Sequence, residues 1–130
     1  MNAPSIDIKD MLVAADLGLT FGTNLFVARE PSMPVRCTTI YDTPGMGPGL
    51  TMDPAERYEY PSIQVRIRHD DYRKGWKLAE DIITTLHGCY NQTVNNTVYT
   101  HIRCSGGPFL LERDANERFI IVINFNLQRR

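Results

Sequence analysis

The segment Ser62–Arg68 has the sequence SIQVRIR, in which apolar and polar residues alternate strictly. Successive side chains of a β-strand point to opposite faces of a sheet. The apolar positions therefore share a core face, and the polar positions, which include Arg66 and Arg68, share a solvent face. The segment therefore predicts a half-exposed strand.

A helical pattern follows this strand. Apolar residues recur at a spacing of three to four and charged residues occupy the opposite face, which is typical of an amphipathic helix. The apolar positions are Tyr72, Trp76, Ala79, Ile83 and Leu86. Asp70 or Asp71 is expected to cap the start of this helix, and Gly88 to end it.

The chain before the strand predicts a helix, two short strands and a long loop. Apolar residues at helical spacing predict a helix over residues 6–17, with Ser5 as its N-cap. Runs of β-branched and aromatic residues predict a strand pair at 25–28 and 36–41. Residues 42–59 are rich in proline and glycine and have no periodicity, so a long irregular loop is expected there. Loops of that length are usually functional or disordered.

The chain after the helix predicts further strands. Asn95 and Asn96 suit the two-residue turn of a hairpin, because asparagine tolerates positive φ angles. The returning strand is expected to end near Cys104, where the sequence SGGP at 105–108 breaks it. After a short strand from Phe109, the last and longest strand is expected at 118–128. Its first half is apolar on both faces, as in a central strand covered on both sides.

Because the predicted strands and helices cluster and do not strictly alternate, the sequence predicts an α+β fold, a mainly antiparallel β-sheet flanked by two main helices. A chain of 130 residues is long enough for one core and too short for two. We therefore expect a single domain over 1–130, with the loop 42–59 inserted in it.

Composition and charge exclude several classes of protein. The chain is 42% hydrophobic and 22% charged, as in an ordinary globular domain. Its formal net charge of −1 disfavours dedicated nucleic-acid binding. The longest apolar runs, such as Phe119–Ile123, are far shorter than a membrane span, and no secretory signal is recognisable. We expect no membrane association, and we expect a chain that stays in the cytoplasm where it is made.

No set of residues forms a complete catalytic site. The sequence DTPG at 42–45 resembles one element of GTPases, but no phosphate-binding loop accompanies it. His69, Asp70 and Asp71 are adjacent in sequence and cannot enclose a metal ion without further ligands. No nucleophile elbow is present. We expect no catalytic residue, no metal site and no cofactor, and hence a protein that is not an enzyme.

One candidate contact surface lies on the predicted sheet. Arg66 and Arg68, together with Tyr99, His101 and Arg103, are expected to form a basic and aromatic patch that meets a partner. The alternative is an ordinary exposed sheet face, which needs polar residues in any case.

Other candidate contacts lie in loops and at the last strand. Met46, Leu50 and Met52 stand among glycines in the long loop and form an adaptable apolar surface, or else a disordered one. Arg129 and Arg130 follow the last strand and are expected at a sheet edge or an interface.

Several segments carry a resemblance to a known family. They are IDIKDML (6–12), TIYDTPG (39–45), YPSIQVR (60–66), AEDI (79–82), IRCSGGP (102–108) and NFNLQRR (124–130). Together they resemble a family of small bacteriophage proteins known as minor capsid or tail-completion proteins. The chain is similar in size and element order to the tail terminators of long-tailed phages (siphoviruses), including that of phage lambda.

This resemblance implies a structural virion protein at the head–tail junction, assembled in the host cytoplasm. It implies a homo-hexameric ring that caps the tail tube and stops polymerisation of the major tail tube protein. It also implies that the ring then docks onto the head–tail connector or stopper protein, and that DNA passes through its lumen. A near-neutral chain suits such a lumen, because clustered Lys and Arg would hold the phosphates.

The residues 42–59 and the turn at Asn95 and Asn96 are the expected contacts of this ring. Two alternatives remain. A head-completion or connector-adaptor protein would share the size and the symmetry and differ in its neighbour. A small-molecule-binding α+β domain would need a pocket with convergent polar groups, which this sequence does not reveal.

Overall fold

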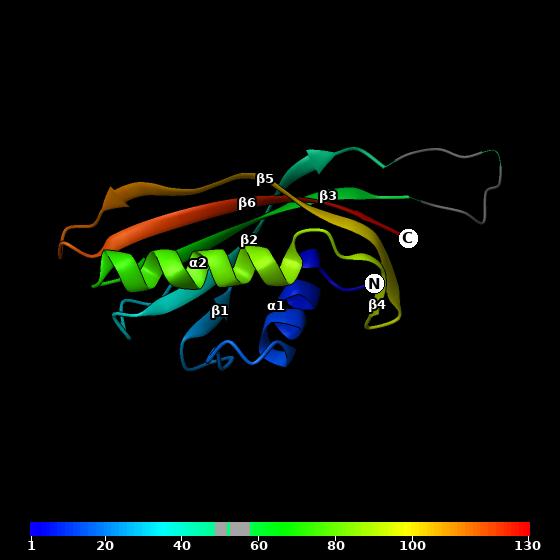
Figure 1. The fold of residues 1–130 in the computed structure, drawn as a ribbon. Coiled ribbons are helices and arrows are strands. Elements are labelled where there is room, and N and C mark those ends of the chain that lie inside the picture. The colour runs from blue at the N-terminus through cyan, green and yellow to red at the C-terminus, as the bar shows by residue number, and fades with distance from the viewer. Residues whose placement is uncertain (49–51, 53–57) are drawn as a thin grey trace.

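The computed structural model describes residues 1–48, 52 and 58–130. Two helices lie on one face of a six-stranded, curled sheet (Figure 1). The elements are α1 (Pro4–Ala14), β1 (Leu25–Val27), β2 (Cys37–Met46), β3 (Tyr60–His69), α2 (Tyr72–Leu86), β4 (Tyr90–Val94), β5 (Thr97–Arg113) and β6 (Phe119–Arg129). The strand order is β1-β2-β3-β6-β5-β4, and every neighbouring pair is antiparallel except β1 and β2. The predicted α+β class is confirmed.

The core lies between the sheet and the two helices. Ile63, Val65 and Ile67 of β3 are fully buried, as their alternation predicts. The two helices contribute their own buried apolar side chains, which are Ile8, Met11, Leu12, Ala79, Ile82 and Leu86. Burial of these side chains provides most of the free energy that holds the helices on the sheet.

The predicted second helix is confirmed as α2, but its buried face is shifted from the predicted one. Ala79 and Leu86 are buried as expected and Ile82 is buried as well, whereas Tyr72 is exposed and Trp76 and Ile83 are half-buried.

The carboxylate of Asp71 accepts hydrogen bonds from the backbone N–H groups of Arg73 (3.0 Å) and Lys74 (3.3 Å), as an N-cap does. Gly88 follows the helix with a φ angle of +86°, which a residue without Cβ adopts readily.

The first helix differs from its expected bounds. Helix α1 begins at Pro4 with Ala3 as its N-cap, and it ends at Ala14 instead of residue 17. Proline suits the first turn, because the backbone N–H that it lacks would have no helical partner there. Ser5 is therefore not the N-cap. Its buried hydroxyl donates to Asp42 Oδ2 of β2 at 2.7 Å and fastens the helix to the sheet.

The expected strand pair is present as β1 and β2, and these strands are parallel. Parallel neighbours require a connection that crosses the sheet. Here the crossing residues contact the face of the sheet away from the helices, the outer face, where Arg68 donates to the carbonyl oxygens of Pro34 and Val35.

The expected loop 42–59 is wrong at its start, because β2 continues to Met46 with a register shift between Thr43 and Met46. Glycine allows this pairing: a Cβ on Gly45 would lie 2.1 Å from the carbonyl oxygen of Tyr60. The later part of the predicted loop, residues 49–51 and 53–57, lies outside the described residues.

We predicted that the sequence SGGP at 105–108 breaks a strand, and this prediction is wrong. Strand β5 runs through this sequence for 17 residues, with register shifts on either side of Gly106, and is longer than β6, which has 11. β-Bulges absorb the extra residues without ending the pairing. The central position of β6 is confirmed, since Ile120 and Val122 on its outer face are buried as well.

Candidate assembly surfaces

The turn between β4 and β5 has the predicted geometry. Asn95 and Asn96 have φ angles of +50° and +64°, which are typical of a two-residue hairpin turn. The Asn95 side-chain amide donates to Asp7 Oδ1 and Asp10 Oδ2, both at 2.8 Å. The turn is therefore fastened to α1, while Asn96 is exposed at its tip.

A buried polar network lies beside this turn. The Tyr99 hydroxyl donates to Asp7 Oδ2 at 2.5 Å, and Arg129 Nη1 lies 3.9 Å from the same oxygen. Arg129 also donates to the carbonyl oxygen of Asn2 at 2.7 Å and lies 3.5 Å from the Glu59 carboxylate. Burial and the bond to Asp7 raise the pKa of Tyr99 well above its ordinary value, so the phenol stays protonated.

This network corrects the expectation for the last strand. Arg129 is buried within the protein, whereas Arg130 is exposed, with its guanidinium 6.0 Å from the centre of the Tyr58 ring. Asp7, whose side chain is fully buried, was not among the predicted site residues. Its burial could have been predicted from its position four residues before the apolar Met11, because residues four apart share one helix face.

Arg66 and Arg68 lie on the outer face of β3, but that face is covered there. Arg68 is only 4% exposed and donates to the carbonyl oxygens of Pro34 (2.6 Å) and Val35 (3.1 Å). Arg66 is half-buried, with Nη2 3.7 Å from the carboxylate of Glu30. The expected solvent exposure is wrong for Arg68, because the connection from β1 to β2 crosses over its side chain.

The predicted basic and aromatic patch is also divided by a register shift. The pairing of β5 with β6 shifts between Tyr99 and His101, so Tyr99 is buried against α1 while His101 and Arg103 are exposed. The alternation that placed these residues on one face fails because a bulge reverses it.

His101 and Arg103 instead share a groove with Met46. This groove has a volume of about 450 Å³, and its lining is Pro44, Gly45, Met46, Tyr60, Ser62, His101, Arg103, Asn126, Leu127 and Gln128. Met46 is 77% exposed, and Met52 is fully exposed. Leu50 lies outside the described residues. A methionine beside polar side chains suits contact with a polypeptide surface.

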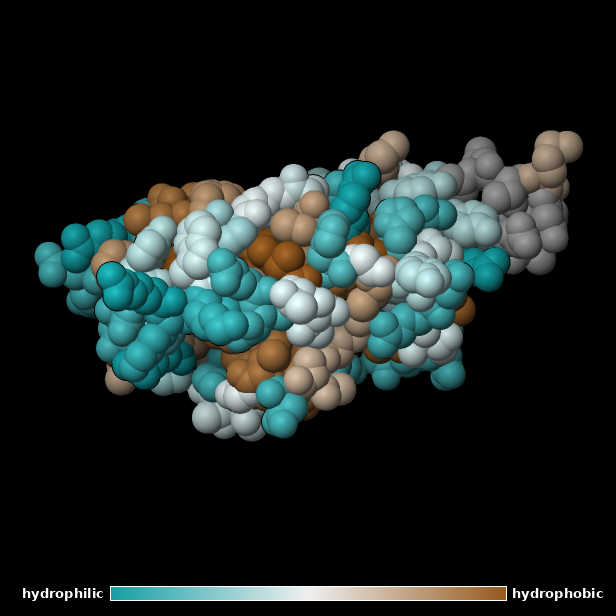
Figure 2. Space-filling view, in the orientation of Figure 1, coloured by the Kyte–Doolittle hydropathy of each residue, from teal (hydrophilic) through white to brown (hydrophobic). Residues whose placement is uncertain are grey.

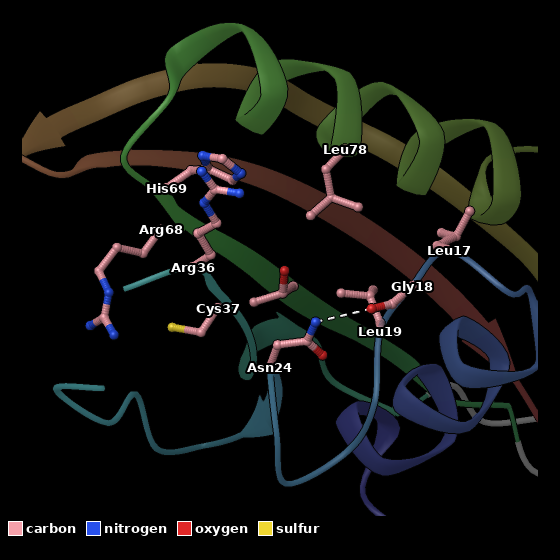
Figure 3. Close-up of a pocket in the computed structure, with 10 residues that line it drawn as sticks. Leu17, Gly18, Leu19, Asn24, Arg36, Cys37, Arg68, His69 and Leu78 are labelled. Atoms are coloured by element: carbon pink, nitrogen blue, oxygen red, sulfur yellow. Dashed lines mark hydrogen bonds between the residues drawn. The ribbon is translucent and has the colours of Figure 1, made fainter. Parts of the chain in front are cut away.

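A second, smaller hollow lies between β3, α2 and the segment that precedes β1 (Figure 3). Its volume is about 150 Å³, and its lining includes His69, Cys37, Arg68 and Asn24. Burial lowers the pKa of His69 and raises the pKa of the Cys37 thiol. Both groups are therefore held neutral, and His69 Nδ1 accepts a hydrogen bond from the N–H of Asp71 at 2.9 Å. The residues that line this hollow come from several elements and pack them together. The neutral Cys37 thiol is not an activated nucleophile.

Within the described residues, no group of three or more His, Cys, Asp or Glu side chains is arranged to hold a metal ion. In the same part of the chain, no helix has the length and apolar character needed to cross a membrane.

Comparison with known proteins decides the family. The model of the bacteriophage tail terminator protein family matches residues 11–130, nearly the whole chain. The chain belongs to the bacteriophage tail terminator family. This confirms the resemblance found in the sequence and makes the chain a structural protein of phage tails.

The fold of this tail terminator family member is also found in a solved structure. A chain from the virion of a native gene transfer agent (GTA) particle superposes with a TM-score of 0.68 at 14% sequence identity. The match covers 98% of this chain and 94% of the other, so the two share the fold over nearly their full lengths. None of the curated proteins matches this tail terminator family member in sequence.

Proposed function

We propose that this protein is the tail terminator of its phage, a homo-hexameric ring at the head–tail junction. The ring caps the tube built from the major tail tube protein, stops its growth and joins the tail to the head–tail connector or stopper protein. The observation that carries this proposal is the match to the tail terminator family over residues 11–130.

The surface chemistry supports this role. The formal net charge of −1 gives no overall attraction for DNA, so a lumen built from this chain would let DNA slide through without specific binding. Met46, Met52, Asn96 and Arg130 are exposed and remain candidate contacts with the neighbouring proteins. We propose Leu50 as a further contact. Arg66, Arg68 and Arg129 make their contacts within the protein.

Electron microscopy of lysates from a phage with a nonsense mutation in this gene tests the proposal. Uncapped tubes keep growing, so over-long tubes beside DNA-filled, tailless heads are expected. Complementation with the wild-type gene should restore tails of normal length. Tails of normal length that fail to join heads would instead identify a head-completion or connector-adaptor protein, and normal virions would contradict both roles.

A further inference from the structure

The far end of β5 carries an unusual run of exposed apolar residues, which we call the arm. Phe109, Leu110 and Leu111 are 40%, 41% and 47% exposed. A hydrophobic area is visible where β5 ends (Figure 2). Because consecutive strand residues point to opposite faces, the arm presents apolar side chains on both of its faces.

The backbone of the arm is open as well. Strand β4 pairs with β5 only from Thr97 to His101, so among the described residues no strand pairs with the arm on the side away from β6. Proteins usually protect such an edge with charges, proline or a covering element. An open edge with contiguous apolar side chains is typical of a protein–protein contact.

A matching apolar groove lies at the opposite edge of the sheet. It has a volume of about 240 Å³ and is lined by Phe21, Phe26, Val27, Arg29 and Pro31. Phe21 is 54% exposed. Since an apolar cavity of about 150 Å³ accepts benzene, this groove has room for a large apolar side chain.

The two surfaces complement each other in place and in charge. The groove lies at β1 and the arm at β5, on opposite sides of the six-stranded sheet (Figure 1). Arg29 lines the groove and is exposed, and Glu112 follows the arm and is also exposed. A protrusion on one edge and a hollow on the other cannot meet within one molecule, but they can meet between two.

We infer that the arm of one subunit docks into the groove of the next, with Glu112 of the first facing Arg29 of the second. The occupant of the groove is thus a second copy of this chain. Such a head-to-tail contact repeats until the subunits close a ring. This inference rests on the proposed function and assigns surfaces to the contact between ring subunits.

Mixing two variants tests the contact. Leu111→Glu places a charge on the arm and leaves the groove intact, and Phe21→Glu does the reverse. Each variant alone should lose the concentration-dependent association of the wild type in analytical ultracentrifugation. An equimolar mixture should form a heterodimer and nothing larger, because only one intact arm and one intact groove remain. Val13→Glu, at a 43% exposed residue on α1, is the control and should associate as the wild type does.

Chemical cross-linking tests the same contact when association is weak. Protein with both Arg29→Cys and Glu112→Cys, treated with a short bis-maleimide, should give a ladder of multimers on a denaturing gel. Either single variant, compared with treated wild type, should give at most one additional cross-linked dimer. Circular dichroism checks that each variant is folded.

The outcomes separate the inference from the proposed function. If the wild type associates, a mixture of the two variants without heterodimer overturns the inference. If the wild type stays monomeric up to about 1 mM, the absence of a cross-linked ladder in the double cysteine variant overturns it. Over-long tails in the nonsense mutant would leave the terminator role intact in that case. A ladder together with normal tails would support the contact and reject the role.

Discussion

His69 is a residue whose charge the fold controls. It ends β3, lies in the hollow of Figure 3 and accepts a hydrogen bond from the N–H of Asp71. Burial lowers the pKa of its imidazole, and the nearby Arg36 acts in the same direction, while Asp70 and Asp71 oppose it. A protonated imidazole cannot accept the hydrogen bond from Asp71, so protonation also weakens the start of α2.

The stability of the protein should therefore depend on pH through His69. In the unfolded chain the pKa returns to its ordinary value of 6.5, so that chain binds the proton more readily than the folded one. The contribution of His69 is present above this pH and is lost as the pH falls below it. Urea unfolding from pH 7.5 to about 5 should show a smaller loss of unfolding free energy in His69→Gln than in the wild type.

The exposed His101 provides the control for this prediction. His101→Gln should keep the pH dependence of the wild type. If His69→Gln and His101→Gln lose stability equally as the pH falls, another group is responsible.

Individual side chains could be predicted only in part. The alternation in Ser62–Arg68 correctly placed Ile63, Val65 and Ile67 in the core. It failed for Arg68, since the residues that cover it come from a connection whose path depends on the parallel pairing of β1 and β2. Periodicity describes the faces of one strand and carries no information about what crosses them.

At the scale of elements, β5 depends on one glycine. Gly107 has a φ angle of +98°, and a Cβ there would lie 2.6 Å from the carbonyl oxygen of Val122 in β6. Gly107→Ala should lower the free energy of unfolding by about 1–3 kcal/mol, because it adds backbone strain and a close contact. Chemical denaturation measures this loss.

The neighbouring glycine is a matched control. A Cβ on Gly106 would meet only the side-chain amide of Asn124, at 3.9 Å. Gly106→Ala should therefore change the unfolding free energy by less than about 0.5 kcal/mol. Equal losses in the two variants would mean that β5 does not follow the described path at this point.

The elements with a strong periodic pattern were predicted well, and those with irregular pairing were not. Helix α2 and the hairpin turn at Asn95 and Asn96 were identified from spacing and from turn residues. The sequence SGGP at 105–108 was mistaken for a break because glycine and proline usually end strands. Only the pairing with the following strand β6 shows that bulges continue the strand, and the residues 105–108 by themselves do not indicate that pairing.

At the scale of the whole molecule, Arg129 holds together parts that are far apart in the chain. Its guanidinium contacts Asn2, Asp7 and Glu59. Arg129→Met should lower the free energy of unfolding by about 3 kcal/mol, because it leaves the buried Asp7 with one partner fewer. Urea denaturation provides the measurement.

The adjacent arginine allows a direct comparison. Arg130 is exposed, so Arg130→Met should change the unfolding free energy by no more than about 0.5 kcal/mol. A loss in Arg130→Met that matches the loss in Arg129→Met would show that removal of a positive charge, and not the buried network, is the cause.

The fold class and the family were both predictable from the sequence, the first from the clustering of strands and helices and the second from segments spread over the chain. The candidate surfaces were less predictable. The arm and the groove involve residues near 110 and residues 21–31, and only the strand order places them at opposite edges of the sheet.

The place of β6 has a consequence for how the protein is made. The strand at the centre of the sheet, which joins β3 to β5, comes after all the other strands in the chain. During synthesis on the ribosome, β3 and β5 emerge before β6, which pairs with both of them. The six-stranded sheet can therefore form only after β6 has emerged. Long-range pairing of this kind slows folding. A translation product that stops before β6 therefore cannot form the complete sheet.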